Sequence, residues 1–453
     1  MKRFLSLLLC LVLVLSLCAG CGSGDDTPET APPSETAEAT KPIIPAVRVL
    51  IFQPELAELW EALAADYTAA TGVPVTVTAC DTKNWEQTLR RHLEEEDAPT
   101  LFQMLTPTGT GDWESLCYDL TKTDGAEALI SNSYALSEGE KILALPDGVN
   151  AWGIWVNRKL LEKTPFTLED ITSQADLKAV ADAVSAAGEE LGFSAFAPLP
   201  EDRSQVFLPL ASAAVSLEYR QDALKSPHKF QGTQLEGLCS LLALLSQSDT
   251  RSFMEGKSLF CPGSAADWAD LSAAFSAEDL ALIPAFLDET PVTFVSEEEA
   301  EETQPTEETE PTEETEPAEE ADPQGLLVGP ERYWCVNPQA PDQDLPVTLD
   351  FLDWLLGTED GAAALAALGA DLPYTTAPKL QNPFLPELDG KDLLHRRDWA
   401  MPSYQWQTAL MEALSAYTEA PTADNRDAAA KVFSGYWAAE YALTDPANET
   451  GES

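Results

Sequence analysis

Residues 47–79 read VRVLIFQPELAELWEALAADYTAATGVPVTVTA, and this stretch decides the fold. The apolar, β-branched run at 47–52 predicts a strand, and VPVTVTA at 73–79 predicts another. Between them, Pro54 opens a segment whose apolar residues recur at helical spacing until Gly72 ends it. The crossover of such a strand, helix and strand unit is right-handed, which requires parallel strands in a sheet that helices cover.

The next residues repeat this pattern and extend the α/β lobe. Residues 84–97 predict a second helix, and residues 100–104 predict a third strand. In such sheets, ligands bind beyond the carboxyl ends of the parallel strands. The polar residues at these ends are candidates for ligand contact: Gln53, Thr82, Gln103 and Thr106. Because they are amides and hydroxyls, and no glycine-rich phosphate motif occurs here, they suit a neutral, hydroxyl-rich ligand.

The rest of the body builds a second lobe and then returns to the first. A long helical region begins near Ser173, and strand-like character returns with GLLVGPERYWCVN at 325–337. Two interleaved α/β lobes leave a cleft between them, which is the common place for a small-ligand site. We expect an N-lobe at 47–148 and 285–372, a C-lobe at 149–284 and 373–445, and a tail at 446–453.

An acidic insertion at 296–324 interrupts the expected N-lobe. It repeats the motif PTEETE, contains no basic residue, and carries prolines that break any helix. We expect a disordered excursion whose removal leaves the fold intact. Calcium capture or cell-wall spacing is the alternative, although the repeat lacks the glycine turn and the ligand spacing of a calcium loop.

The N-terminus predicts export. Two basic residues precede an apolar run that is short for a membrane span, so we expect a signal peptide at 1–20 and a flexible linker at 21–46. The sequence LCAGC resembles the bacterial lipobox, which implies lipid attachment to the Cys21 thiol and anchoring at the extracellular face of the membrane. Cys18 stands where that motif usually has Leu. A plain cleaved signal or an uncleaved anchor is the alternative.

Composition limits the partners of the chain. The formal charge of -51 arises from 77 acidic and 26 basic residues, and it excludes nucleic acid as a partner because phosphates would be repelled. Hydrophobic residues make up 44% of the 453 residues, enough for a large core in two or more domains. Five cysteines remain beyond the signal and the lipid site: Cys80, Cys117, Cys239, Cys261 and Cys335. Their odd number and their spacing exclude a complete disulfide framework and match no zinc motif, so we expect mostly buried thiols with at most two bridges.

An enzyme is the least expected of the alternatives. A secreted glycosidase needs two carboxyl groups across a cleft, and the candidates near the cleft motifs are Asp112, Glu114 and Asp147. Nothing in these motifs singles out a pair. The three histidines are far apart in sequence, and no metalloprotease motif or serine nucleophile elbow is present. We therefore expect a binding protein without catalytic residues, cofactor or metal.

Several segments, in order over nearly the whole mature chain, resemble the extracellular solute-binding lipoproteins of bacterial carbohydrate ABC transporters, which are distantly similar to the maltose-binding protein. They include ALPDGVNAWGIWVNRKLLEK at 144–163, LGADLPYTTAP at 368–378 and SGYWAAEYAL at 434–443. The resemblance implies a two-lobe periplasmic-binding-protein fold and a monomer that captures a sugar or oligosaccharide and delivers it to the transmembrane permease subunits of an ABC transporter. A peptide or other solute as the ligand, and a sensing role, are the alternatives.

The resemblance also implies ligand contacts. Residues 153–157 match the family's inter-lobe crossing, so Asn150 and Trp152 would face the sugar, the amide binding hydroxyls and the indole stacking on a pyranose ring. Relatives often carry Glu at the position of Asn150, and its loss weakens the expected affinity for a charged or highly polar sugar. The other contacts carried over are Gln103, Thr106, Trp113, Trp268, Tyr374 and Trp406.

Closure of the two lobes is the expected mechanism of capture. By the same resemblance, we expect hinge motion at three crossings, near residues 147–154, 284–290 and 371–376. Residues 264–266 occupy the place where relatives have a first stacking aromatic, so only Trp268 remains in that element. The ligand shelf there is expected to be smaller or shifted.

Overall fold

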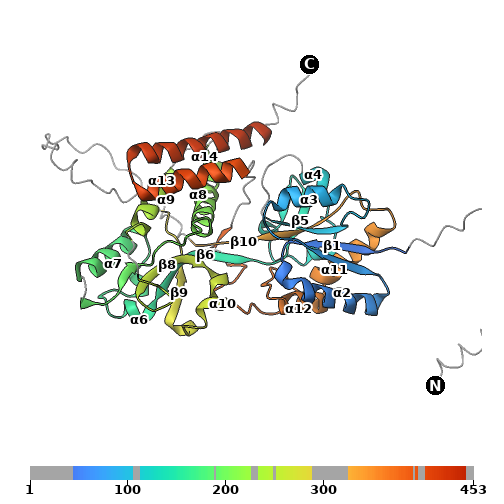
Figure 1. Cartoon of the computed structure of the whole chain (residues 1–453), viewed down its shortest axis with the longest axis horizontal. Coiled ribbons are helices and arrows are strands. Elements are labelled where there is room, and N and C mark those ends of the chain that lie inside the picture. The colour runs from blue at the N-terminus through green and yellow to red at the C-terminus, as the bar shows by residue number, and fades with distance from the viewer. Residues whose placement is uncertain are drawn as a thin grey trace, which may run out of the picture. The chain divides into compact units, whose positions relative to one another are not determined.

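In the computed structural model, the described part of the chain forms two six-stranded β-sheets with helices packed against them (Figure 1). The structure describes the following residues: 44–105, 113–187, 190–225, 233–247, 251–287, 325–390, 393–395 and 404–444. None of the helices in these ranges is both long enough and apolar enough to cross a membrane. The expected signal peptide, Cys21, most of the linker, the acidic insertion and the tail lie outside the described residues.

The first sheet has the strand order β2-β1-β3-β11-β5-β4. Its strands are β1 (Val47–Ile51), β2 (Val75–Ala79), β3 (Leu101–Leu105), β4 (Leu136–Glu138), β5 (Lys141–Pro146) and β11 (Arg332–Val336). Strand β1 pairs in parallel with both β2 and β3, which confirms the parallel pairing predicted from the opening stretch. Strand β11 returns from far along the chain and pairs antiparallel with β3 and β5. We call this sheet and its helices the N-lobe.

Helices cover both faces of the N-lobe sheet (Figure 1). One face carries α2 (Ala57–Thr71), α11 (Asp344–Gly357) and α12 (Glu359–Ala367), and the other carries α3 (Trp85–Leu93) and α4 (Trp113–Leu116). The short helix α5 (Asp124–Glu127) packs beside α11. A 3-10 turn (Pro54–Leu56) precedes α2, which ends at Gly72 with a φ of 79°, a left-handed conformation that favours glycine.

The second sheet has the order β12-β10-β6-β8-β7, and β9 pairs with β6. Its strands are β6 (Asn150–Asn157), β7 (Ser194–Phe196), β8 (Ser258–Ser264), β9 (Leu280–Ile283), β10 (Leu326–Gly329) and β12 (Leu393–His395). The accompanying helices are α6 (Arg158–Leu161), α7 (Gln174–Ala187), α8 (Ser204–Lys225), α9 (Thr233–Leu245), α10 (Trp268–Leu271), α13 (Tyr404–Glu419) and α14 (Ala423–Thr444). We call this sheet and these helices the C-lobe.

Strand β6 is the centre of the C-lobe sheet, and all eight of its residues are buried. Position 153 has room only for glycine, because a Cβ atom there would lie 2.1 Å from the backbone oxygen of Ile283 in β9. No side chain fits at that distance. The glycine of the predicted crossing motif is therefore required by the close approach of two paired strands.

The chain passes between the lobes at places that differ partly from those expected. The first passage, between β5 and β6, lies at residues 147–149 as expected. The second was expected at 284–290, but Phe286 and Leu287 belong to the apolar core of the C-lobe, and β10 pairs with β6. That passage therefore falls between β10 and β11, because backbone pairing keeps β10 in the C-lobe sheet. The third falls after Tyr374, which pairs with Leu129 of the N-lobe.

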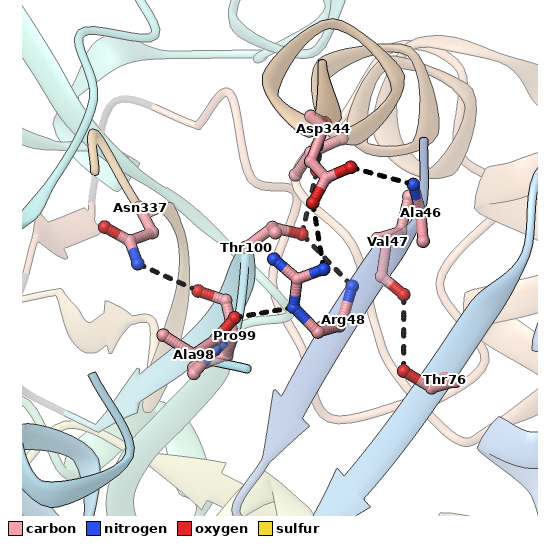
Figure 2. A network of polar contacts seen from close by, with 10 residues as sticks. Ala46, Val47, Arg48, Thr76, Ala98, Pro99, Thr100, Asn337 and Asp344 are labelled. Carbon is pink, nitrogen blue, oxygen red and sulfur yellow. Dashed lines mark hydrogen bonds and ion pairs between the residues drawn. The ribbon is translucent and has the colours of Figure 1, made fainter. Parts of the chain in front are cut away.

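A buried polar network fixes the start of the N-lobe sheet (Figure 2). Asp344, the first residue of α11, accepts hydrogen bonds from the Ala46 amide at 3.0 Å and from Arg48 Nη1 at 2.9 Å. Arg48 Nε donates to the carbonyl of Ala98 at 2.8 Å, and the Arg48 amide donates to Thr100 Oγ1 at 3.1 Å. One carboxylate at a helix start thus connects β1, α11 and the segment before β3.

Candidate functional site

A cavity of about 430 Å³ lies where segments of both lobes meet. We call it the central cavity. Its lining comes from residues 147–149 between β5 and β6, Asn150 at the start of β6, Ala266, Trp268 and Ala269 after β8, residues 331–332 before and in β11, residues 369–371 after α12, and Gln381, Asn382 and Leu385. Each of these segments follows or precedes a secondary-structure element, so the two sheets fix the cavity walls.

An ion pair between Asp147 and Arg332 forms part of the wall. Asp147 Oδ2 accepts from Arg332 Nε at 2.9 Å and from Gln103 Nε2 at 2.8 Å, and the residue is 5% exposed. Within the described residues, Asp147 Oδ1 is buried and has no hydrogen-bond partner. Burial raises the pKa of the Asp147 carboxyl, and the charge and hydrogen bond of Arg332 oppose that rise. One oxygen of the carboxylate is therefore buried without a partner, next to the ion pair in the cavity wall.

Two glutamines support this ion pair from the N-lobe side. Gln103 Nε2 also donates to Gln53 Oε1 at 3.0 Å, and Gln103 Oε1 accepts from the Phe52 amide at 2.8 Å. Gln53 lines a second, smaller cavity of about 50 Å³, which Asp147 and Arg332 also line. Gln103 in the middle of β3 and Gln53 just after β1 thus hold the carboxylate in place through a chain of side-chain amides.

Asn150 connects three segments of the cavity wall. Its Oδ1 accepts from the amides of Ala151 at 2.9 Å and Ala266 at 3.1 Å, and its Nδ2 donates to Glu331 Oε1 at 3.1 Å. These bonds orient the Glu331 carboxylate at the cavity. The side chain of Asn150 therefore acts in this structure mainly by positioning its neighbours.

Trp268 is the aromatic residue of the cavity wall. It begins α10, is half-buried, and its ring lies edge-on to the ring of Phe384, with the ring centroids 5.1 Å apart. The ring presents apolar surface to the cavity. Because Phe384 already holds it in place, little side-chain entropy is lost when a ligand binds.

Amides and a further carboxylate complete the polar lining. Asp371 Oδ1 accepts from the Gln381 amide at 2.9 Å, and Asn382 Nδ2 donates to the Ala265 carbonyl at 2.6 Å. Asn382 thereby ties the segment after the third passage to the segment that carries Trp268.

The structure brings four of the sequence-predicted contacts to this region. Asn150 and Trp268 line the central cavity, Gln103 reaches it through Asp147, and Gln53 lines the smaller cavity beside it. These positions follow from strand ends and from the first passage, which are the features that the sequence patterns located.

Three other predicted contacts lie elsewhere. Trp152 is 8% exposed and packs in the apolar core of the C-lobe, beside a space of about 20 Å³. Tyr374 is 2% exposed, and its hydroxyl donates to the Pro146 carbonyl at 2.7 Å. Thr82 is exposed after β2 and does not line either of the two cavities at the lobe junction. Alternation along β6 explains Trp152, because its side chain shares the face of Ile154 and Val156.

The remaining candidates cannot be placed at the cavity from the described side chains. Thr106 lies outside the described residues. Trp113 begins α4 and Trp406 lies in α13, but their side chains are outside the described part.

The charged residues of the cavity were largely missed by the sequence patterns. They are Asp147, Glu331, Arg332 and Asp371. Asp147 was noted only as a possible catalytic acid. The available signal was their place directly after strands, in ALPDG and LLVGPER, and after the helix that ends near Gly369. With 77 acidic residues in the chain, that signal does not separate them from surface charges.

Catalytic geometry does not emerge from the described side chains. Among them, no group of three His, Cys, Asp or Glu residues could hold a metal ion. Cys80 Sγ lies 3.6 Å from His92 Nε2, and His92 Nδ1 lies 3.0 Å from Glu95 Oε2, which places a thiol, an imidazole and a carboxylate in series. Burial raises the pKa of the Cys80 thiol, which disfavours the thiolate that a nucleophile would need.

The lining can bind a ligand with many hydroxyl groups. Three carboxylates, one guanidinium and several amides supply both donors and acceptors, and the indole supplies an apolar face. The excess of carboxylates repels an anionic ligand. A two-lobe α/β fold with such a cavity at the lobe junction has the form of a small-ligand binding site.

The comparisons with known proteins agree with a binding role. A sequence profile described as bacterial extracellular solute-binding protein matches residues 62–384. The chain therefore belongs to the bacterial extracellular solute-binding protein family. A search of the curated proteins found no match.

Solved structures of solute-binding proteins share the fold. A family 1 extracellular solute-binding protein from Bifidobacterium longum subsp. infantis is 15% identical with a TM-score of 0.61, over 87% of this chain and 99% of that chain. A Streptococcus pneumoniae solute-binding protein in complex with the blood group A-trisaccharide is 12% identical with a TM-score of 0.58, over 87% and 100%. The cyclic alpha-maltosyl-1,6-maltose binding protein from Arthrobacter globiformis is 14% identical with a TM-score of 0.59, over 87% and 99%.

Proposed function

We propose that this chain is an extracellular receptor that captures a neutral sugar or oligosaccharide in the central cavity and delivers it to the permease of an ABC transporter. The observation that carries the proposal is the cavity of about 430 Å³, which combines carboxylates, amides and Arg332 with the ring of Trp268. A pyranose has hydroxyls around its edge and an apolar face, and this lining matches both. The saccharides named for the structural relatives support the same ligand class.

Each part of the lining has a role in this proposal. Arg332 donates a hydrogen bond to a ligand hydroxyl, and its ion pair with Asp147, which Gln103 supports, holds the guanidinium in place. Glu331, positioned by Asn150, accepts from another hydroxyl. Because these side chains are already held by their neighbours, ordering them on binding costs little.

Capture involves movement of the lobes about the three passages. A ligand that contacts residues of both lobes stabilises the closed arrangement in proportion to its preference for that arrangement. Thr106, Trp113 and Trp406 stay predicted ligand contacts in this proposal. The chain acts as a monomer held at the extracellular face of the membrane by a lipid on Cys21.

Thermal unfolding with a panel of ligands tests the proposal. The panel contains neutral mono- and oligosaccharides, uronic acids, short peptides and polyamines. A ligand present at 100 times its Kd adds about 2.7 kcal/mol of stability, which is a readily measured rise in Tm. We expect the rise with one class of neutral saccharide and no rise with uronic acids.

Two matched tryptophan variants locate the site. Trp268→Leu removes the ring of the cavity wall, and Trp354→Leu removes a half-buried ring of α11 that packs on Tyr67 and Phe351. We expect the saccharide-induced rise in Tm to disappear in Trp268→Leu and to persist in Trp354→Leu. A rise with peptides alone would retain the receptor class and overturn the saccharide assignment.

A further inference from the structure

Two cysteines meet in the core of the N-lobe. Cys335 lies in β11, and Cys117 directly follows α4. They are 0% and 4% exposed and belong to the same apolar cluster, on the sheet face that α3 and α4 cover. They come from segments far apart in the sequence, and the tertiary fold alone makes them neighbours.

Backbone and side-chain contacts both connect the two positions. The amide of Tyr118 donates to the carbonyl of Val336 at 2.8 Å, so the residues that follow the two cysteines are hydrogen-bonded to each other. Both cysteines are free thiols in this structure, and they pack in the same apolar cluster. Burial, together with the Cys117 thiol, raises the pKa of the Cys335 thiol well above its ordinary value.

Two of the other three described thiols lie elsewhere: Cys239 is in the apolar core of the C-lobe, and Cys261 is in β8 beside Trp155. Cys80 packs against the same cluster as the pair, and its Sγ lies 3.6 Å from His92 Nε2. The backbone hydrogen bond between Tyr118 and Val336 is what brings Cys117 and Cys335 side by side.

We propose that Cys117 and Cys335 form a disulfide bond when the chain folds in an oxidising extracellular medium. The two thiols lose two protons and two electrons as the S–S bond forms, and a low-molecular-weight disulfide accepts them and is reduced to two thiols. Because both sulfur atoms are buried in the folded chain, the exchange takes place during folding, while a thiolate is still accessible. The family to which the chain belongs is extracellular, where disulfides persist.

The bond would act on the strand that carries part of the binding site. Strand β11 begins with Arg332, whose guanidinium pairs with Asp147 at the central cavity. A covalent link from β11 to the segment after α4 holds this strand within the N-lobe. It also closes a long loop of the chain, and in the chain-entropy account long loops give the largest stabilisation.

Peptide mapping of the full chain tests the proposal. The chain is refolded in oxidised and reduced glutathione, a matched sample is refolded with a phosphine reductant, and both are denatured, alkylated and digested. We expect the oxidised sample to contain one cross-linked peptide that joins Cys117 to Cys335, and to show a Tm several degrees above that of the reduced sample. Full alkylation of both cysteines in the oxidised sample, or their cross-linking to other cysteines, would overturn the proposal.

Two serine variants separate this bond from a general effect of oxidation. In Cys117→Ser we expect Cys335 to be alkylated in both samples and the difference in Tm to disappear. In Cys239→Ser, which alters a buried thiol of the other lobe, we expect the difference to persist. Mapping of the unsubstituted chain decides the question where a variant does not fold, and the result does not depend on which ligand the receptor binds.

Discussion

The ion pair at the central cavity gives the sharpest prediction for stability. Arg332→Gln leaves the Asp147 carboxylate, 5% exposed, with only the neutral amide of Gln103 as a partner. Breaking a buried pair by removing one partner costs about 3–5 kcal/mol, because an uncompensated charge stays buried. The free energy of unfolding of Arg332→Gln should therefore fall by roughly this amount at neutral pH.

A surface pair provides the matched control. Lys257 Nζ and Glu255 Oε2 are 2.7 Å apart, closer than the 2.9 Å between Arg332 and Asp147, but the two surface side chains are 57% and 61% exposed. Water screens such a pair, so Lys257→Gln should cost at most about 1 kcal/mol. Burial, and not distance, thus decides the size of the effect.

The loss in Arg332→Gln should depend on pH, and its sign follows from the pKa of Asp147. Burial raises the pKa of this carboxyl above its ordinary value of 3.8, and removal of Arg332 removes an interaction that lowers it. A group whose folded pKa is raised favours the folded state at low pH, and that contribution is lost as the pH rises through the folded pKa. The penalty of the variant should therefore be largest at neutral pH and shrink in mildly acidic buffer.

Urea unfolding followed by tryptophan fluorescence measures these differences, with the midpoint compared at constant slope. Asp147→Asn in the Arg332→Gln background removes the buried charge and should restore much of the lost stability. A loss below about 1 kcal/mol, equal at both pH values and unchanged in the double variant, would refute the reasoning.

Three further variants test the fold and the site. Gly153→Ala places a Cβ atom 2.1 Å from a backbone oxygen and should cost several kcal/mol in urea unfolding, whereas Gly148→Ala, with its nearest atom at 3.4 Å, should cost little. Asp344→Ala removes the carboxylate that joins β1 to α11 and should lower the free energy of unfolding by about 3 kcal/mol at neutral pH, which calorimetry would show as a lower Tm. Gln103→Leu leaves a backbone amide and the Asp147 carboxylate each without one partner, and should weaken saccharide binding more than 10-fold in titration calorimetry.

Short-range sequence patterns correctly predicted the first strand and the first helix of the N-lobe. The apolar run at 47–52 became β1, and the helical spacing after Pro54 became a 3-10 turn and then α2, which ends at Gly72. These elements were predictable because strand and helix periodicity, proline and glycine act within a few residues. The second passage between the lobes was placed wrongly, because the pairing of β10 with β6 depends on a distant strand.

Patterns in the sequence were enough to predict the α/β class, the parallel start of the first sheet, the resemblance to solute-binding lipoproteins and a role for the amides of Gln53 and Gln103. The charges of the central cavity could not be predicted in this way, because Asp147, Glu331 and Asp371 belong to separate segments that meet at the lobe junction in the folded chain. The folded structure also places Trp152 in the apolar core of the C-lobe. The physical reason is that periodicity tells which residues share a face of an element, whereas the packing of distant elements decides whether that face meets a core or a cavity.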